Sequence, residues 1–304
     1  MNSRLLQVLR PGRVIYSQMM NLSSAASGKK QYETLLVTET KPFVFNVQLN
    51  RPKNLNALNN KMWIEITECF NELAENADCR VIVLSGVGKN FCAGLDLKDA
   101  MSFGQGLAEH DDIARKCKFM NKKIKTYQDT CTSIEKCPKP VIGAAHGACV
   151  GAAVDMLSAT DIRYCSSNAW FQIKEIDIGM AADVGTLQRL PKIIGSNSLV
   201  RELALTGRKL PANEALQCGF VNRVFDNEEK LFNEALSLAE EIASKSPVAV
   251  QTTKISLNYS RDHTVDEGLD HIRERNQAML QSEDFINAVV AQATKDDPPV
   301  FSKL

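Results

Sequence analysis

Several features that would assign this chain of 304 residues to common functional classes are missing from it. The 36 Lys and Arg residues balance the 36 Asp and Glu residues, so no net charge attracts nucleic acid or an anionic membrane. No apolar run approaches the ~18 residues of a membrane-spanning helix. The sequence also contains no GxSxG elbow, no P-loop and no dinucleotide-binding GxGxxG motif. These absences argue against a membrane protein and against three widespread classes of enzyme.

Cysteine and histidine are present but form no recognisable pattern. The nine Cys residues include no CxxC pair and have no regular spacing to the four His residues. We therefore expect no metal site and no disulfide framework, and we expect free thiols in a reducing compartment or organelle matrix. With 44% apolar and 24% charged residues, the composition is that of a soluble globular protein with a sizeable core.

Both ends of the chain carry candidate targeting signals. Residues 1–32 include five basic residues and several Ser residues but no Asp or Glu. This composition resembles a mitochondrial transit peptide, although a plain disordered tail has the same appearance. The chain ends in Ser302, Lys303 and Leu304, a tripeptide that a peroxisomal import receptor recognises. We expect the protein in both organelles.

Alternating and continuous apolar runs predict a series of strands. In 43–50 the apolar residues alternate, as in a strand with one buried face, whereas the next runs are continuous, as in strands buried on both faces. Helical patterns, the first at 63–73, separate them. Strands that alternate with helices predict an α/β fold with a parallel sheet and right-handed crossovers. The expected strands are 43–50, 80–86, 138–147, 169–173 and 220–225.

The sequence from residue 228 onward is helical in pattern. Apolar residues recur at helical spacing from 228 to Pro247, and two further helices are expected at 249–259 and 265–293. Such a region packs on the α/β body or on a neighbouring subunit.

Two turns rich in Gly and Ala follow predicted strands. In FCAGLDLKDA (91–100), Asp96 has the position of a helix cap, but Ala93 and Gly94 could also aim a free backbone N–H at a ligand. In HGACVGAAVD (146–155), small residues around Gly151 and Ala152 allow either a ligand or a packed helix to approach the backbone. If both turns present an N–H group to one oxygen, they can stabilise an oxyanion or enolate.

Three acidic residues lie in apolar surroundings. Asp155 follows the second turn, Glu175 follows the strand at 169–173, and Asp183 lies among Ala, Val and Gly residues. Each is either a structural cap or a functional group whose pKa is raised by burial. We interpret Asp161 and Asp177 as structural.

Five motifs resemble the enoyl-CoA hydratase/isomerase (crotonase) superfamily in sequence and in order. The resemblance extends from about residue 32 to the end of the chain, and it implies a spiral of ββα units, a helical C-terminal trimerisation region and a hexamer of two trimers. The domains implied are a leader (1–31), a core (32–227), a helical region (228–301) and a targeting signal (302–304). The motifs are NRPKNLNALN, GKNFCAGLDL, PKPVIGAAHGACVGAAVD, ADVGTLQRLPKIIG and ALTGRKLPANEALQCGFVNRVF.

The resemblance also implies where a CoA thioester binds. By analogy, the backbone N–H groups of Leu95 and Ala152 form the oxyanion hole, and the turn that contains Leu95 contacts the substrate through Ala93, Gly94, Asp96 and Leu97. The family usually has Gly where this chain has Ala152 and Ala153, so the pocket beside the thioester is expected to be narrower. No cofactor is implied, because CoA is part of the substrate.

Within the superfamily, the three acids and the segment YSRDH (259–263) are most similar to an isomerase of dienoyl-CoA. Hydratases have Glu at the first two acidic positions and Gly at the third, whereas this chain has Asp155, Glu175 and Asp183. We expect proton transfer from C2 to C6 of a 3,5-dienoyl-CoA, with Glu175 at C2, Asp183 at C6 and Asp155 setting the local polarity. Which of Glu175 and Asp183 serves C2 remains open at this point, and 2-enoyl-CoA hydration is the alternative reaction.

A rival interpretation from another class is an RNA-binding protein of the same fold. The segment RKCKFMNKKIKTYQ (115–128) carries six basic residues. Its aromatic content is low and the net charge is zero, so a solvated helix face, or a wall that attracts the CoA phosphates, is the favoured interpretation. We expect no nucleic-acid partner.

Overall fold

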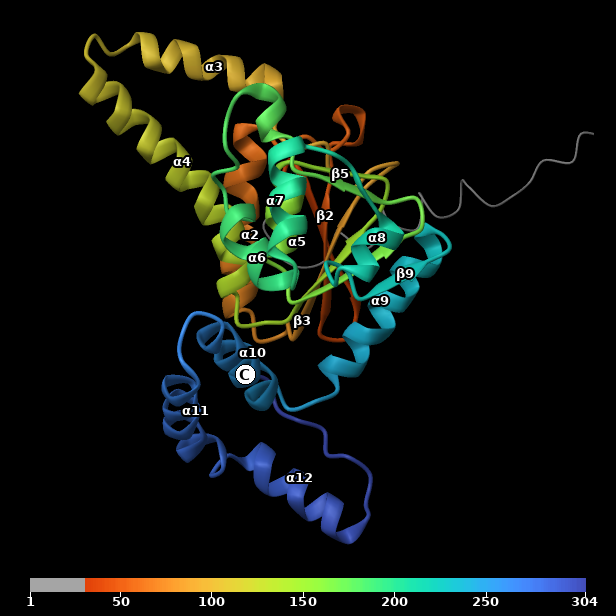
Figure 1. Ribbon diagram of the computed structural model, residues 1–304. Helices are drawn as coiled ribbons and strands as arrows, with labels where there is room; N and C mark the ends of the chain where they lie inside the picture. The colour runs from red at the N-terminus through yellow and green to blue at the C-terminus, as the bar shows by residue number, and fades with distance from the viewer. Residues whose placement is uncertain (1–30) are drawn as a thin grey trace, which may run out of the picture. The chain divides into compact units, whose positions relative to one another are not determined.

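The computed structural model describes residues 31–304, without the side chains of residues 100, 102 and 103. The chain divides into Met1–Tyr32 and Glu33–Leu304, and the fold reported below is that of the second unit (Figure 1). Residues 1–30 of the expected leader lie outside the described residues, and the predicted domain boundaries remain predictions. The strands are β1 Leu35–Lys41, β2 Val44–Leu49, β3 Val81–Gly86, β4 Val141–Ala145, β5 Ala148–Val150, β6 Ile162–Ser166, β7 Trp170–Gln172, β8 Leu210–Pro211 and β9 Arg223–Phe225.

The helices connect these strands and continue beyond the last of them. They are η1 Pro52–Asn54, α2 Asn60–Glu75, α3 Leu97–Ala108, α4 Ile113–Lys136, α5 Ala152–Ser158, η2 Glu175–Ile178, α6 Thr186–Ile193, α7 Asn197–Thr206, α8 Ala212–Gln217, α9 Glu228–Ala243, α10 Pro247–Ser260, α11 Val265–Met279 and α12 Glu283–Thr294.

A six-stranded sheet in the order β1-β2-β3-β4-β6-β9 forms the centre of the fold. Every pair from β2 to β9 is parallel, and only the edge strand β1 is antiparallel to its neighbour. All residues of β3 and β4 are buried, as expected for central strands covered on both faces. The predicted α/β class with a parallel sheet is confirmed.

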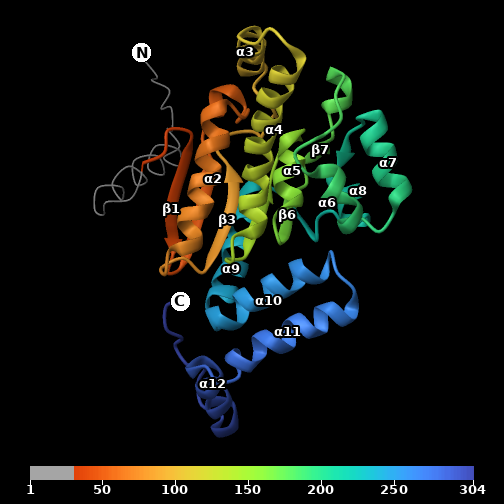
Figure 2. The ribbon, with the colours of Figure 1, turned by 90° about the vertical axis from the view of Figure 1, so that its left-hand side faces the viewer.

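Helices cover both faces of this sheet. Figure 2 shows α2, α4 and α5 on one face and α9 on the other. The apolar stripe of α9, which includes Leu231, Ala235 and Ala239, packs on Val83 and Ile142 of the central strands. On the opposite face, α5 lies so close to β4 that a Cβ on Gly143 would lie 2.8 Å from Leu157 Cδ2. The sheet is therefore fixed from both sides, which gives rigid support to the turns that follow its strands.

Two expected elements are broken in the structure, and strands β1, β6 and β8 lie outside the expected ranges. The predicted strand 138–147 is wrong in extent, because a turn with Gly147 at φ +56° separates β4 from β5, and β5 joins a second sheet with β7 and β8. The single helix predicted at 265–293 is also wrong, because the Ser282 side chain accepts the Phe285 N–H and begins a new helix, α12. Strand β1, which the sequence analysis did not predict, is the edge strand.

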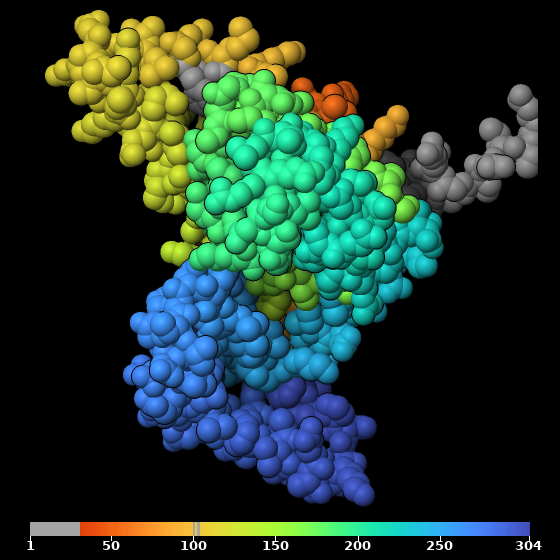
Figure 3. All heavy atoms as spheres, in the orientation of Figure 1, coloured from red at the N-terminus to blue at the C-terminus, as the bar shows by residue number. Residues whose placement is uncertain are grey.

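Helices α10–α12 form a C-terminal group that contacts the body of the fold through α10 (Figure 3). The Lys254 ammonium of α10, whose side chain is buried, donates to the Lys139 carbonyl at 2.9 Å and pairs with Asp161 at 2.7 Å. The Asp161 carboxylate also accepts the Val141 N–H at the start of β4. Asp161 is thus structural, as predicted.

Candidate active site

The two Gly/Ala turns lie side by side because short strand-like pairings join them. Cys92 pairs with β5 through hydrogen bonds to Ala148 and from Val150, of 3.1 and 3.0 Å. Gly94 follows with φ +88°, and a Cβ at this position would lie 2.8 Å from the Val150 carbonyl oxygen and 3.9 Å from Gly151 Cα. Only glycine allows this conformation together with such a close backbone approach. The first turn is therefore packed directly against the second.

Each turn has a backbone N–H group that is left without an acceptor. The N–H groups of Ala93, Gly94 and Asp96 all donate to neighbouring residues. Among the described residues, no acceptor is found for the N–H of Leu95 or for that of Ala152, although Ala152 is buried. Buried N–H groups are nearly always hydrogen-bonded. Two unpaired donors on adjacent turns can bind one ligand oxygen, and these are the two donors that the resemblance implied.

The first turn ends in Asp96, whose side chain forms hydrogen bonds, and Leu97, whose side chain is exposed. Asp96 caps α3 by accepting the Lys98 N–H at 3.1 Å, and it pairs with the Arg51 guanidinium at 2.9 Å. Its carboxylate therefore holds the turn in place, as the capping interpretation predicted. Leu97, the first residue of α3, is exposed. Arg51 was not singled out from the sequence, although it belongs to the quoted motif NRPKNLNALN.

Glu175 lies next to the second turn. The Gly151 N–H donates to the Gln172 carbonyl at 2.8 Å, and β5 and β7 run parallel, so the residue that begins η2 comes beside Gly151. A Cβ on Gly151 would lie only 3.0 Å from Glu175 Oε1. Glu175 Oε2 is buried and has no hydrogen-bond partner among the described residues. Burial, helped by the nearby Asp155 carboxylate, raises the pKa of Glu175 to about 7.

Asp155 is completely buried in the first turn of α5. Its Oδ1 accepts the Thr186 N–H at 2.6 Å, whereas Oδ2 has no hydrogen-bond partner within the described part of the chain. Burial raises the pKa of Asp155 to about 6. The carboxylate is thus poised to titrate near neutrality, which is unusual for an aspartate.

Asp183 completes the group from the loop between η2 and α6. Its carboxylate is close enough to raise the pKa of both Asp155 and Glu175 by repulsion. Partial burial raises its own pKa. Asp183 also lines an open, polar hollow of about 310 Å³, together with Gln128, Arg189 and other residues. The structure therefore brings all three predicted acids together, with Asp183 facing a hollow that solvent can enter.

Several residues around the acids were not singled out from the sequence. Arg189 and Gln128 donate to carbonyl groups of the segment 183–186, and Thr186 of that segment donates its N–H to Asp155. Thr186 and Arg189 belong to the quoted motif ADVGTLQRLPKIIG. Gln128 and Asp183 are 55 residues apart in the chain, so their contact leaves no local pattern in the sequence, whereas the motif could have indicated Thr186 and Arg189. Asp177, interpreted as structural, pairs with Lys174 on the exposed face of η2.

The basic segment contacts one of the three acids through its last residue, Gln128, which donates to the Asp183 backbone carbonyl. The basic segment 115–128 lies on α4, where Arg115 and Lys125 pair with Asp112 and Asp129, so two of its six charges are balanced locally. Within residues 31–304 no three His, Cys, Asp or Glu side chains are grouped so that they could hold a metal ion. In the same range, no helix combines the length and the apolar character needed to cross a bilayer.

Comparison with known proteins relates the whole arrangement to one family. Residues 39–300 match the family described as Enoyl-CoA hydratase/isomerase. The chain is 49% identical to the protein named "Delta(3,5)-Delta(2,4)-dienoyl-CoA isomerase, mitochondrial" of Rattus norvegicus, over 99% of this chain and 96% of that protein. It is 52% identical to the Homo sapiens protein of that name, over 90% and 84% of the two chains. It is 44% identical to the Arabidopsis thaliana isomerase named as peroxisomal, over 90% and 99%.

Solved structures of similar fold include proteins with another named activity. An enoyl-CoA hydratase from Bacillus anthracis has a TM-score of 0.79 at 27% identity, covering 88% of this chain and 98% of that one. One from Mycobacterium smegmatis has a TM-score of 0.79 at 25% identity with the same coverage. Proteins named hydratases thus share the fold, while the proteins named isomerases share about twice as much of the sequence.

Proposed function

The chain belongs to the enoyl-CoA hydratase/isomerase family, and from this membership we propose that it converts 3,5-dienoyl-CoA to 2,4-dienoyl-CoA. This isomerisation is a step in the β-oxidation of unsaturated fatty acids. The observation that carries the proposal is the position of Glu175 against Gly151, with Asp183 as a further acid in the same group. Curated relatives that are 44–52% identical have this activity in their names.

The first step is removal of a proton from C2. The thioester oxygen accepts hydrogen bonds from the N–H groups of Leu95 and Ala152, which stabilise the enolate that forms when the C2–H bond breaks. C2 is bonded to the thioester carbon, so the base must lie beside the oxyanion hole. Glu175 meets this requirement, because its carboxylate is packed against Gly151. This position supports Glu175 as the base at C2.

The second step returns a proton at C6. The negative charge left by deprotonation is conjugated through C4 to C6, and a new C6–H bond leaves double bonds at C2 and C4. Asp183 supplies this proton, and its raised pKa keeps a fraction of the group protonated. The Asp155 carboxylate sets the local polarity by repelling negative charge on Glu175, which favours the protonated form of Glu175. Glu175 has then gained one proton and Asp183 has lost one, so before the next turnover Glu175 must release its proton and Asp183 must take one up. Asp183 can take up its proton from solvent in the open hollow that it lines.

No cofactor is needed for these steps. The donors to the thioester are backbone N–H groups, the acid and base are carboxylates, and CoA enters and leaves as part of the substrate. The equilibrium favours the product without a cofactor, because the 2,4-diene is conjugated with the thioester carbonyl and the 3,5-diene is not.

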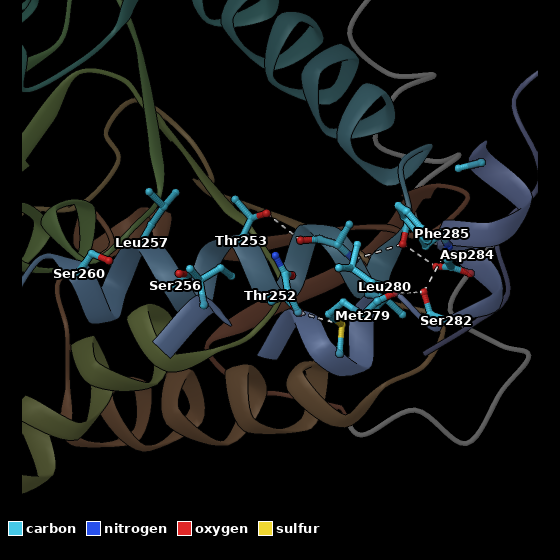
Figure 4. Close-up of a pocket in the computed structure, with 16 residues that line it drawn as sticks. Thr252, Thr253, Ser256, Leu257, Ser260, Met279, Leu280, Ser282, Asp284 and Phe285 are labelled. Atoms are coloured by element: carbon cyan, nitrogen blue, oxygen red, sulfur yellow. Dashed lines mark hydrogen bonds between the residues drawn. The ribbon is translucent and has the colours of Figure 1, made fainter. Parts of the chain in front are cut away.

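A homohexamer of two trimers is the proposed assembly. Its support is the apolar surface of the C-terminal helices, where Leu257, Val265 and Leu269 are 67%, 78% and 58% exposed. A groove of about 510 Å³ lies between these helices. Figure 4 shows residues that line it, among them Thr252 and Leu280. Exposed apolar surface of this kind is typical of a subunit interface.

The location in mitochondria and peroxisomes agrees with the names of the relatives. The rat and human relatives are named mitochondrial and the Arabidopsis thaliana relative is named peroxisomal. Binding of the peroxisomal import receptor to 302–304 is proposed from the accessibility of this segment. Ser302, Lys303 and Leu304 are all exposed, so a receptor can reach their side chains in the folded protein.

Two assays run side by side test the proposed reaction. Purified protein is mixed with 3,5-dienoyl-CoA, and formation of the conjugated 2,4-dienoyl thioester is followed by its ultraviolet absorbance. The same preparation is mixed with 2-enoyl-CoA, and loss of the enoyl absorbance reports hydration. We expect rapid isomerisation and slow hydration. Rapid hydration without isomerisation would reject the proposal in favour of a hydratase.

A further inference from the structure

The backbone that carries Asp183 is held at four consecutive residues. The Gln128 side chain of α4 donates to the Asp183 carbonyl at 2.9 Å, and the Arg189 guanidinium donates to the Val184 carbonyl at 3.4 Å. Arg189 also lies against Gly185. The Thr186 N–H donates to Asp155 at 2.6 Å. Three different helices therefore restrain this short loop, which we call the Asp183 loop (183–186).

Gly185 allows the closest of these approaches. Its φ is +137°, and a Cβ built on it would lie 1.8 Å from Nη1 of Arg189. No side chain can occupy that space while the guanidinium lies flat on the loop. The guanidinium therefore lies directly against the backbone of the loop, and both this approach and the positive φ favour glycine at position 185.

The arginine is in turn held by Glu135 of α4. Arg189 Nε and Nη2 donate to the two carboxylate oxygens of Glu135 at 3.1 and 3.0 Å, a bidentate pair in which both side chains are almost buried. Burial opposes ionisation of Glu135, but hydrogen bonds and charges of Arg189 and Arg261 outweigh it and lower its pKa. Planar bidentate pairs of this type fix orientation as well as distance.

The pair also connects the loop to the C-terminal helices. Arg261, at the end of α10, is a second partner of Glu135, and it pairs with Asp262, which pairs with Lys192 of α6. Arg261 and Asp262 belong to the segment 259–263 that the sequence analysis singled out. Through these ion pairs the segment helps to hold Glu135 and α6 in position, and so contributes indirectly to the position of the Asp183 loop.

From this arrangement, and on the basis of the proposed function, we propose that Glu135 and Arg189 are positioning residues for proton delivery at C6. Glu135 orients Arg189, Arg189 supports 184–185, and the loop then holds the Asp183 carboxylate at the far end of the conjugated chain. Glu175 and the oxyanion donors lie on other elements, so the support acts on one half of the reaction. A displacement of about 1 Å at a proton-transfer site can lower the rate by ~100-fold.

If Glu135 acts only on proton delivery at C6, its substitution should slow isomerisation but not the exchange of C2 protons. Glu135→Gln retains the size of the side chain but removes the charge and one acceptor. We expect kcat for isomerisation to fall by at least about tenfold while KM and the exchange of C2 protons with D₂O change by less than about twofold. The matched control is Glu214→Gln, which breaks another bidentate arginine pair, with Arg208 at 2.9 and 2.6 Å, on α8. The control is expected to leave both rates unchanged.

A double-mutant cycle shows whether Glu135 acts through Asp183. In the Asp183→Asn background, Glu135→Gln should have little further effect on isomerisation, because the group that it positions is already inactive. Independent, multiplied effects in the two backgrounds would overturn the proposal. Equal losses of C2 exchange and isomerisation in the single variant would overturn it as well, because they indicate general structural damage.

A second variant keeps the test decisive if Glu135→Gln folds poorly. Gln128→Met removes the hydrogen bond to the Asp183 carbonyl and leaves the ion pair intact, so it should show the same selective loss of isomerisation to a smaller degree. Unchanged isomerisation in a folded Gln128→Met rejects the proposal when Glu135→Gln cannot be measured. Failure of the wild-type protein to convert 3,5-dienoyl-CoA rejects instead the proposed function on which the proposal rests.

Discussion

Asp155 Oδ1 accepts a hydrogen bond of 2.6 Å from the Thr186 N–H, and this contact joins the first turn of α5 to the first residue of α6. The other carboxylate oxygen is buried without a partner among the described residues. A buried carboxylate that is only half satisfied destabilises the fold when it is ionised. Such a group is retained where the reaction needs its charge, so stability and activity should respond in opposite directions to its removal.

Replacing Asp155 by Asn should therefore stabilise the protein at neutral pH. The folded-state pKa of about 6 lies above the unfolded value of about 3.9, so ionisation is harder in the folded state. The resulting penalty is absent below the unfolded pKa, grows as the pH rises to about 6, and corresponds to roughly 3 kcal/mol. Asn retains the acceptor for Thr186. Chemical denaturation at pH 4 and pH 8 should show a stabilising difference only at pH 8.

The acid limb of the pH–rate profile should report Glu175. The base at C2 must be ionised, and burial together with Asp155 raises its pKa to about 7, so kcat/KM should rise with pH through about 7. In Asp155→Asn the neighbouring charge is lost, and this limb should move to lower pH. A limb that stays in place in the variant would contradict the coupling between the two carboxylates. Profiles are measured by stopped-flow absorbance with substrate well below KM.

The sequence predicted what depends on local pattern and missed what depends on distant contacts. A strand buried on both faces is a continuous apolar run in the sequence, so β3 and β4 could be predicted. The three acids could be found because each is a carboxylate in apolar surroundings. Strand β1 could not, because only one of its seven residues is buried. The break after β4 also left no pattern, since it arises where Gly147 approaches the Lys89 carbonyl, so that a Cβ would lie 2.3 Å from its oxygen.

The ion pair of Glu135 and Arg189 could not be predicted either, because it too depends on a distant contact. Glu135 and Arg189 are 54 residues apart in the chain, and neither stands out from other charged residues on amphipathic helices. The family resemblance supplied the two oxyanion donors, but the structure supplied the reason for assigning Glu175 to C2. That reason is the contact between Gly151, which follows β5, and Glu175, which lies just beyond the neighbouring strand β7.

Gly151→Ala should therefore impair the C2 step. Gly151 has φ +54°, a conformation that strains an alanine, and the added methyl would meet Glu175 Oε1 at 3.0 Å. Both the base and the adjacent Ala152 N–H would be displaced, so exchange of the C2 proton should fall together with isomerisation, by about tenfold or more. Gly219→Ala is the matched control, because Gly219 has φ +80° but open space where the added methyl would lie. Proton exchange is followed by NMR in D₂O.

The subunit interface gives a prediction that does not depend on the chemistry. Val265 and Leu269 are exposed on α11, and we expect a neighbouring subunit to cover this face. Changing both to Asp would place charges in the proposed apolar contact and should shift the proposed hexamer to smaller species in sedimentation velocity. The same double change on a surface that stays exposed would have no effect on sedimentation. A wild-type protein that sediments as a monomer at micromolar concentration would reject the assembly itself.

Asp183→Asn separates the two halves of the proposed reaction. The substitution retains the shape of the side chain, and the backbone contact from Gln128 to the Asp183 carbonyl does not depend on the carboxylate, so folding and CoA-ester binding should be preserved. It removes the proton donor for C6, and groups of this kind contribute about 10²–10⁴-fold to a rate. Isomerisation should fall by at least ~100-fold with little change in KM. The C2 proton should still exchange with D₂O, because Glu175, Leu95 and Ala152 are intact. Near-normal isomerisation, or an equal loss of C2 exchange, would show that Asp183 does not deliver the proton to C6.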